Sequence, residues 1–148
     1  MQSLPQRLLV VEDDVTVARA LSRTLARAGF SVAIARSCSA ARSLAQSFDF
    51  AIFDLDLPDG NGVDLARALM KSGKVPSVVF FTSSTDPALL ARARRMGPVL
   101  MKSLGTSPIL DLLASPHETT DVPQSGTAPS PRAESYRASS SSLRSRAR

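Results

Sequence analysis

The chain has 148 residues, of which 43% are hydrophobic, and a formal net charge of +5. This length allows one domain with a sizeable core, or a smaller domain followed by a tail. No apolar run approaches the roughly 20 residues that a membrane-spanning helix needs, and the first residues do not have the pattern of a signal peptide. The single cysteine, Cys38, excludes an internal disulfide and is expected to be a small buried or half-buried thiol. These features predict a cytoplasmic protein without membrane association.

The composition changes abruptly near Ser115. Residues 115–148 contain nine serines and four prolines and almost no large apolar side chain. Such a segment cannot bury enough surface to offset the entropy of ordering, so we predict a folded domain at 1–114 and a disordered Ser/Pro/Arg-rich tail at 115–148. The only histidine, His117, lies in this tail, which leaves the predicted domain without a histidine for general-base or phosphocarrier chemistry.

Residues 7–114 alternate between apolar runs typical of buried strands and segments with helical spacing. The predicted strands are 7–11, 31–35, 50–54, 77–82 and 99–101. The predicted helices are 15–28, 39–46, 63–71, 87–96 and about 107–114. Asp86 is expected to cap the fourth helix, with Pro87 in its first position, and Asp14 to help start the first. This alternation predicts an α/β fold, a doubly wound five-stranded parallel sheet with helices on both faces.

Polar residues follow four of the predicted strands. They are Glu12, Asp13 and Asp14 after the first strand, Asp54 at the end of the third, Thr82 and Ser83 at the fourth, and Lys102 after the fifth. Ligands of a doubly wound sheet bind at the carboxyl ends of its strands, so these groups are expected to converge. Clustered carboxylates suit a hard cation such as Mg²⁺, and an aspartate can act as a nucleophile on phosphorus. A metal, a lysine and a hydroxyl would then stabilise the transferring phosphoryl group.

Four segments together resemble the receiver domain of bacterial two-component response regulators. They are LLVVEDD, FDLDLPDGNG, VVFFTSS and MK, and the likeness covers about residues 6–114. The resemblance implies a flavodoxin-like receiver fold in which Asp54 accepts a phosphoryl group from a sensor histidine kinase or a histidine phosphotransfer protein. Because the Ser/Pro-rich tail cannot form a DNA-binding domain, we expect a stand-alone, single-domain signalling module, not an enzyme. It would act through contacts with an unknown downstream protein or as a relay.

The resemblance also assigns roles within the site. The implied ligands of Mg²⁺ are the carboxylates of Glu12, Asp13 and Asp54 and the backbone carbonyl of Asp56. Thr82 and Lys102 match the hydroxyl and the lysine that contact the phosphoryl oxygens, and Ser83 matches a small residue that leaves the phosphoryl group room. Gly60 and Gly62 are expected to supply tight turns before the third helix.

The sequence departs from the family pattern around the fifth strand. Lys102 is followed by Ser103 instead of the usual proline, and Val99 replaces the usual aromatic residue. Four residues separate Gly97 from Lys102, which is shorter than the family pattern. These departures bear on how the signal leaves the domain more than on the phosphorylation site.

Two other classes of protein share part of this pattern. The FDLD segment resembles the first motif of haloacid-dehalogenase-type phosphatases, but no acidic pair follows Lys102 as that family requires. A basic-tailed regulator could instead bind nucleic acid weakly through Arg144, Arg146 and Arg148. We nevertheless expect no DNA binding, because the Ser- and Pro-rich tail cannot form a helix-turn-helix.

Overall fold

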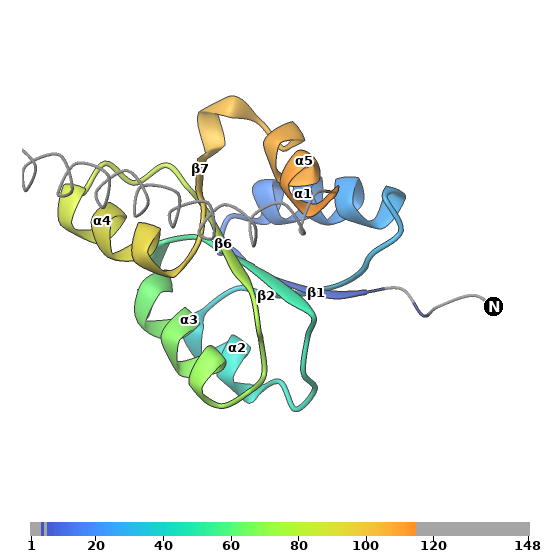
Figure 1. Ribbon diagram of the computed structural model, residues 1–148, viewed down its shortest axis with the longest axis horizontal. Helices are drawn as coiled ribbons and strands as arrows, with labels where there is room; N and C mark the ends of the chain where they lie inside the picture. The colour runs from blue at the N-terminus through green and yellow to red at the C-terminus, as the bar shows by residue number, and fades with distance from the viewer. Residues whose placement is uncertain (1–3, 5, 115–148) are drawn as a thin grey trace, which may run out of the picture. The chain divides into compact units, whose positions relative to one another are not determined.

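The computed structural model describes residue 4 and residues 6–114, which contain a five-stranded parallel sheet with helices on both faces (Figure 1). Its strands are β1 (Arg7–Val11), β2 (Ser31–Ala35), β3 (Phe50–Phe53), β6 (Val78–Thr82) and β7 (Val99–Met101). They lie in the order β2-β1-β3-β6-β7, and every neighbouring pair is parallel. The predicted doubly wound fold is therefore confirmed.

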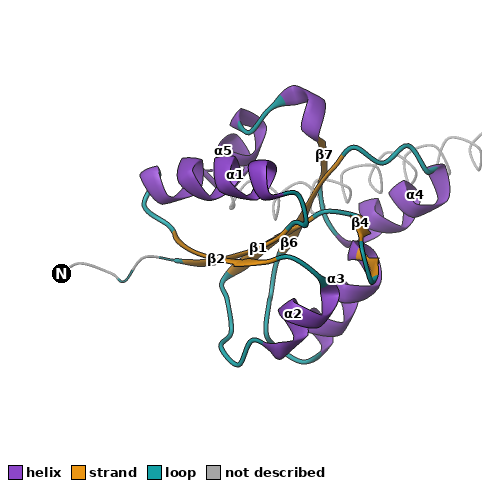
Figure 2. Cartoon of the chain, turned by 180° about the vertical axis from the view of Figure 1, so that it is seen from behind, coloured by secondary structure: helices purple, strands orange, loops and turns teal. Residues whose placement is uncertain are grey.

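Five α-helices and one short 3-10 helix connect or follow the strands. They are α1 (Val15–Arg27), α2 (Cys38–Ser43), α3 (Gly62–Lys71), α4 (Pro87–Met96), η1 (Lys102–Leu104) and α5 (Ser107–Ala114). Helix α1 covers one face of the sheet, and α2 and α3 cover the other (Figures 1 and 2). Both predicted caps are confirmed: the Asp14 carboxylate accepts hydrogen bonds from the first turn of α1, and that of Asp86 does so for α4, which starts at Pro87.

The chain divides into a unit of residues Met1–Leu110 and a unit of Asp111–Arg148. Of the second unit, only the last residues of α5 are described. The predicted disordered tail at 115–148, with His117, lies outside the described residues, so the boundary proposed after residue 114 remains a prediction. Among the helices that are described, none is both long enough and apolar enough to cross a membrane.

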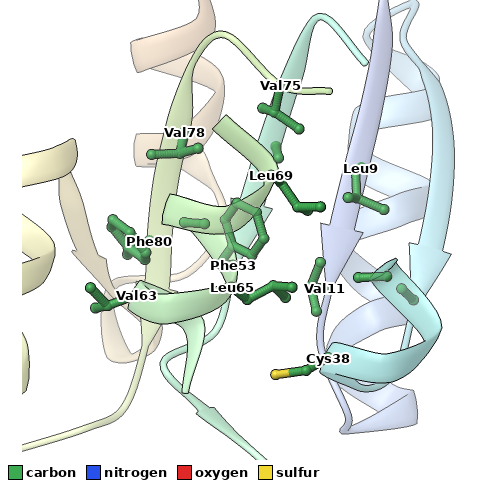
Figure 3. Packing of buried hydrophobic residues seen from close by; sticks show 14 of the residues in the cluster. Leu9, Val11, Cys38, Phe53, Val63, Leu65, Leu69, Val75, Val78 and Phe80 are labelled. Atoms are coloured by element: carbon green, nitrogen blue, oxygen red, sulfur yellow. The ribbon is translucent and has the colours of Figure 1, made fainter. Parts of the chain in front are cut away.

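Buried apolar side chains fill the space between the sheet and the α2–α3 face (Figure 3). Phe53 and Phe80, paired in register on β3 and β6, are fully buried, with ring centroids 6.1 Å apart. Cys38 belongs to the same cluster and is buried, as expected of a lone thiol. Because β3 is covered on both faces, its next residue, Asp54, emerges from an apolar strand directly at the edge of the sheet.

The segment between β3 and α3 contains a small hairpin that the sequence did not reveal. Strands β4 (Asp56–Leu57) and β5 (Gly60–Asn61) pair in antiparallel register. The hairpin starts two residues after Asp54 and leads directly into α3, so it adjoins the end of β3.

Candidate functional site

Glu12 and Asp54 stand side by side because the sheet's hydrogen bonds continue one residue beyond β1 and β3. The Glu12 amide donates to the Ala35 carbonyl at 3.0 Å, and the Asp54 amide donates to the Val11 carbonyl at 3.0 Å. Both side chains are buried, Glu12 with 2% and Asp54 with 5% of its surface exposed. Burying a carboxylate costs free energy unless hydrogen bonds or an opposite charge compensate it. The groups that contact Glu12 and Asp54 therefore determine the chemistry of the site.

Lys102 bridges the two buried carboxylates. Its Nζ lies 2.8 Å from Oδ2 of Asp54 and 2.7 Å from Oε1 of Glu12. The other oxygen of Asp54, Oδ1, accepts a hydrogen bond of 2.7 Å from the amide of Leu55. Asp54 is thus held from two sides, by a backbone amide at one oxygen and by an ammonium group at the other.

The charges in this cluster perturb one another. Burial raises the pKa of Glu12 to about 7; the hydrogen bond from Lys102 opposes this shift, and the negative charge of Asp54 adds to it. Burial alone would lower the pKa of Lys102, but its hydrogen bonds to Asp54 and Glu12 outweigh that effect and the pKa is raised. Lys102 therefore stays charged at neutral pH, while Glu12 holds a proton more tightly than an ordinary carboxyl group does.

Asp13 completes an acidic cluster with the two buried residues. Carboxylate oxygens of Glu12, Asp13 and Asp54 lie within 4.8 Å of one another, and Asp13 is exposed to solvent. When all three are ionised, they face one ammonium group, so two negative charges remain uncompensated, which matches one divalent cation. All the donors are oxygens, the ligands that Mg²⁺ prefers, and the exposed side leaves room for the waters that Mg²⁺ retains. The residues present therefore fit a magnesium ion.

Thr82 and the residues after it form a second arm of the site. Thr82 ends β6, is fully buried, and pairs in register with Met101, the residue before Lys102. Its Oγ1 accepts a hydrogen bond of 3.0 Å from the amide of Ser84. Ser84 is buried, and its own Oγ accepts from the Asp86 amide at 3.3 Å, whereas Ser83 is exposed. Sequence reasoning missed Ser84, because nothing distinguishes it from its neighbours in a run of hydroxyl residues.

Two further residues named in the sequence analysis, Asp56 and Asp14, lie beside this cluster and make different hydrogen bonds to it. Asp56 is exposed, and its amide lies 3.4 Å from Oδ1 of Asp54, a long hydrogen bond. Asp14 caps α1, and its amide donates to Oε2 of Glu12 at 3.2 Å.

Gly62 has a different role from the one expected. It begins α3, and a Cβ atom there would lie 2.1 Å from the backbone oxygen of Asp54. The backbone of Gly62 is not in the left-handed region. Glycine is needed here because the loop packs against the backbone of Asp54, and not to form a tight turn.

Fold and site together define an α/β domain with a carboxylate cluster at the carboxyl ends of a doubly wound parallel sheet. A model of the response regulator receiver domain family matches residues 8–113, more than half of the chain. The chain belongs to this family, whose members are the receiver domains of two-component systems, and the resemblance inferred from the sequence is confirmed.

Relatives and solved structures agree with this assignment. The chain is 36% identical over 88 residues to the DNA-binding response regulator MtrA of Mycolicibacterium smegmatis. The aligned region covers 58% of this chain and 38% of MtrA. It is 29% identical over 117 residues to the photosynthetic apparatus regulatory protein RegA of Rhodobacter capsulatus, covering 78% of this chain and 58% of RegA. The non-phosphorylated receiver domain of HemR from Leptospira biflexa superposes with a TM-score of 0.66 at 31% identity, covering 74% of this chain and 91% of that domain. The chain thus spans less than two thirds of the length of MtrA and of RegA.

Proposed function

We propose that this receiver accepts a phosphoryl group on Asp54 and signals through protein contacts. The observation that carries the proposal is the buried Asp54 carboxylate, held between the Leu55 amide and the Lys102 ammonium beside two further acids. A carboxylate fixed in this way at the edge of a sheet can attack phosphorus without a general base, because a carboxylate oxygen carries no proton that must be removed.

The proposed transfer is a displacement at phosphorus. An oxygen of Asp54 forms a bond to the phosphorus atom, and the bond from phosphorus to the imidazole nitrogen of the donor's phosphohistidine breaks. The imidazole leaves with the electron pair of that bond. Negative charge on the phosphoryl oxygens is met by Lys102, already within hydrogen-bonding distance of Asp54, and by the hydroxyl of Thr82, whose proton is not used in its bond with the Ser84 amide.

Magnesium is the proposed cofactor. Glu12, Asp13 and Asp54 would hold it through their carboxylates, and the backbone carbonyl of Asp56 is the proposed fourth protein ligand. When bound, the ion neutralises charge on the acids and on the phosphoryl group. Glu12 contributes in its ionised form, so metal binding and release of a proton from Glu12 are linked.

A small phosphodonor such as acetyl phosphate, supplied with Mg²⁺, tests the assignment without a cognate kinase. Wild type should gain one phosphoryl group that is stable in acid and labile in base, detected by intact mass. Asp54→Asn should not be labelled. Asp56→Asn is the matched control, because it makes the same substitution two residues away on an exposed side chain and keeps the backbone carbonyl, and it should be labelled like wild type.

Chelation of Mg²⁺ should abolish labelling of the wild type. Undiminished labelling of Asp54→Asn, or labelling that is indifferent to chelation, would contradict the proposed site. Failure of the folded wild type to be labelled by any small phosphodonor would contradict the function as a whole.

The family assignment favours this function over the phosphatase alternative, because receiver domains are signalling domains. The proposed upstream partner is a sensor histidine kinase or a histidine phosphotransfer protein, in the cytoplasm, and the downstream partner is a protein. MtrA is described as DNA-binding, but the chain spans 38% of its length, so the expectation that this chain does not bind DNA remains a prediction.

A further inference from the structure

The tip of the β4–β5 hairpin is bound to the start of α2. Oδ1 of Asp59 accepts a hydrogen bond of 2.8 Å from the amide of Cys38, and Oδ2 accepts one of 2.9 Å from the amide of Ser39. These two amides lower the pKa of the exposed Asp59 carboxyl, so the contact is made by a carboxylate at neutral pH. The Asp59 side chain thereby joins the hairpin to a helix start that lies 20 to 21 residues earlier in the sequence.

Helix α2 depends on this contact for its amino-terminal end. The first amides of a helix have no partners within it. In α2 the Ser37 hydroxyl satisfies the amide of Ala40, and Asp59 satisfies the two before it. The opposite end is capped from elsewhere, by the ammonium of Lys74, which donates to the carbonyls of Arg42 and Leu44. A helix of six residues is thus fixed at both ends by charged side chains from outside.

The β4–β5 hairpin, like helix α2, depends on contacts with the rest of the domain for its stability. It has two pairs, Asp56↔Asn61 and Leu57↔Gly60, and a two-stranded hairpin is marginally stable by itself. Besides the Asp59 contact, Cys38 supports the tip by packing: its Sγ would lie 3.1 Å from a Cβ on Gly60. The base of the same hairpin is Asp56, whose carbonyl is the proposed metal ligand beside Asp54.

We propose that Asp59 is a positioning residue of the phosphoacceptor site, which fixes the Asp56 carbonyl by anchoring the hairpin tip to α2. The inference rests on the proposed function, because it assigns Asp59 a role toward that site. Asp59 lies at the tip of the hairpin and Asp56 at its base. The hairpin transmits the anchor because the Leu57↔Gly60 pair connects the tip to the base.

The rate at which the Cys38 thiol reacts with a reagent reports whether the hairpin still covers it. It is the only cysteine in the chain and is buried under Gly60, so a thiol reagent reports one site. A hollow of about 390 Å³ lined in part by Cys38, Asp59 and Asn61 gives such a reagent room to approach. Burial and the neighbouring Asp59 carboxylate raise the pKa of the Cys38 thiol, so the rates are measured over a range of pH and compared per thiolate. We expect Asp59→Ala to react several-fold faster than wild type on that basis with a disulfide reagent in the absence of metal.

Magnesium binding, measured by calorimetry well below the melting temperature, tests the link to the site. Asp59→Ala should bind Mg²⁺ about tenfold more weakly, the lower end of what removing a support of a metal ligand costs. Lys74→Ala is the matched control, because it frees the other end of α2 without touching the hairpin, and it should bind Mg²⁺ like wild type. Asp59→Asn, which keeps one acceptor oxygen, should fall between Asp59→Ala and wild type, and it replaces Asp59→Ala if that variant does not fold.

Wild-type affinity for Mg²⁺ in the folded Asp59 variants would overturn the inference. Equal weakening in Lys74→Ala would overturn it too, since the effect would then come from loosening α2 in general. Both outcomes leave the function standing if wild type is still labelled on Asp54. Conversely, a wild type that binds Mg²⁺ but accepts no phosphoryl group would contradict the function and leave the hairpin anchor intact.

Discussion

At the scale of single residues, Gly62 shows how closely the backbone approaches the proposed phosphoacceptor. An added Cβ would lie 2.1 Å from the backbone oxygen of Asp54, so the loop would have to shift to accept any side chain. We predict that Gly62→Ala lowers the free energy of unfolding by about 1–3 kcal/mol, the usual cost of overpacking. It should also slow phosphorylation under conditions where the variant remains folded, because Asp54 moves with its own backbone. Circular dichroism melting and labelling with a small phosphodonor measure the two effects.

Gly29→Ala is the matched control for that substitution. Gly29 has a φ of 101° and open space around its Cβ position, so alanine there costs backbone strain, about 1–2 kcal/mol, without a clash. It should therefore lower stability and leave the phosphorylation rate unchanged. If Gly62→Ala is labelled as fast as Gly29→Ala at equal fractions folded, the close approach has no consequence for the site.

The residues of the acidic cluster could be predicted from the sequence, but the contacts among them could not. The carboxyl ends of parallel strands meet at one edge of the sheet. Recognising the strands was therefore enough to predict that Glu12, Asp54 and Lys102 lie close together. Which atoms pair depends on the exact register and on the direction of each side chain. Lys102 forms ion pairs with both Glu12 and Asp54 because of that geometry, and no spacing in the sequence predicts these two contacts.

At the scale of elements, the long apolar segments were predicted well and the short polar ones were not. The strands at 7–11, 31–35 and 99–101 have the bounds expected from their apolar runs. Helix α2 was expected over 39–46 but occupies Cys38–Ser43, because Leu44 is already extended and Lys74 caps the last carbonyls. Two-residue strands such as β4 and β5 have no periodicity to read, and the contact that supports them comes from α2.

Helices and loops also decide how the signal leaves the domain. The Thr82 hydroxyl accepts from the Ser84 amide, so a movement of this hydroxyl toward a phosphoryl group would be passed directly to the loop before α4. Val99 is half-buried, packs against the core and carries no ring that could change place. We predict that activation alters the loops at 56–62 and 83–86 and leaves the face of β7 nearly unchanged, since phosphorylation acts locally on a two-state element.

Amide hydrogen exchange with Mg²⁺, in the presence and absence of a beryllofluoride mimic of the phosphoryl group, measures this distribution. Protection should change most in the two loops. Asp54→Asn under the same conditions is the control for effects of the additives. Large changes centred on residues 99–113, with little at the loops, would contradict the prediction and indicate a switch that works without the usual aromatic residue.

At the scale of the whole molecule, the described site lies entirely before the predicted tail. The acids, the lysine and the hydroxyl all belong to residues 12–102, and the last fully buried side chain, among the described residues, is Ile109. We predict that deleting residues 116–148 changes neither the melting temperature nor the labelling of Asp54. Melting curves and intact mass after treatment with a small phosphodonor are the measurements.

A chain ending at Thr106 is the control, because it also loses Ile109 and should unfold at a lower temperature. Loss of folding on deletion of residues 116–148 alone would place the end of the domain beyond residue 115.

The bridge made by Lys102 has a consequence for the cooperativity of unfolding. Glu12, Asp54 and Lys102 lie at the ends of β1, β3 and β7, so detaching β7 at one edge of the sheet leaves two buried carboxylates without their cation. A buried charge that loses its partner is strongly destabilising, so a chain folded only as far as β6 is penalised at the site itself. The sheet should therefore reach its stable form only when β7 has docked, and partially folded chains should be scarce at equilibrium.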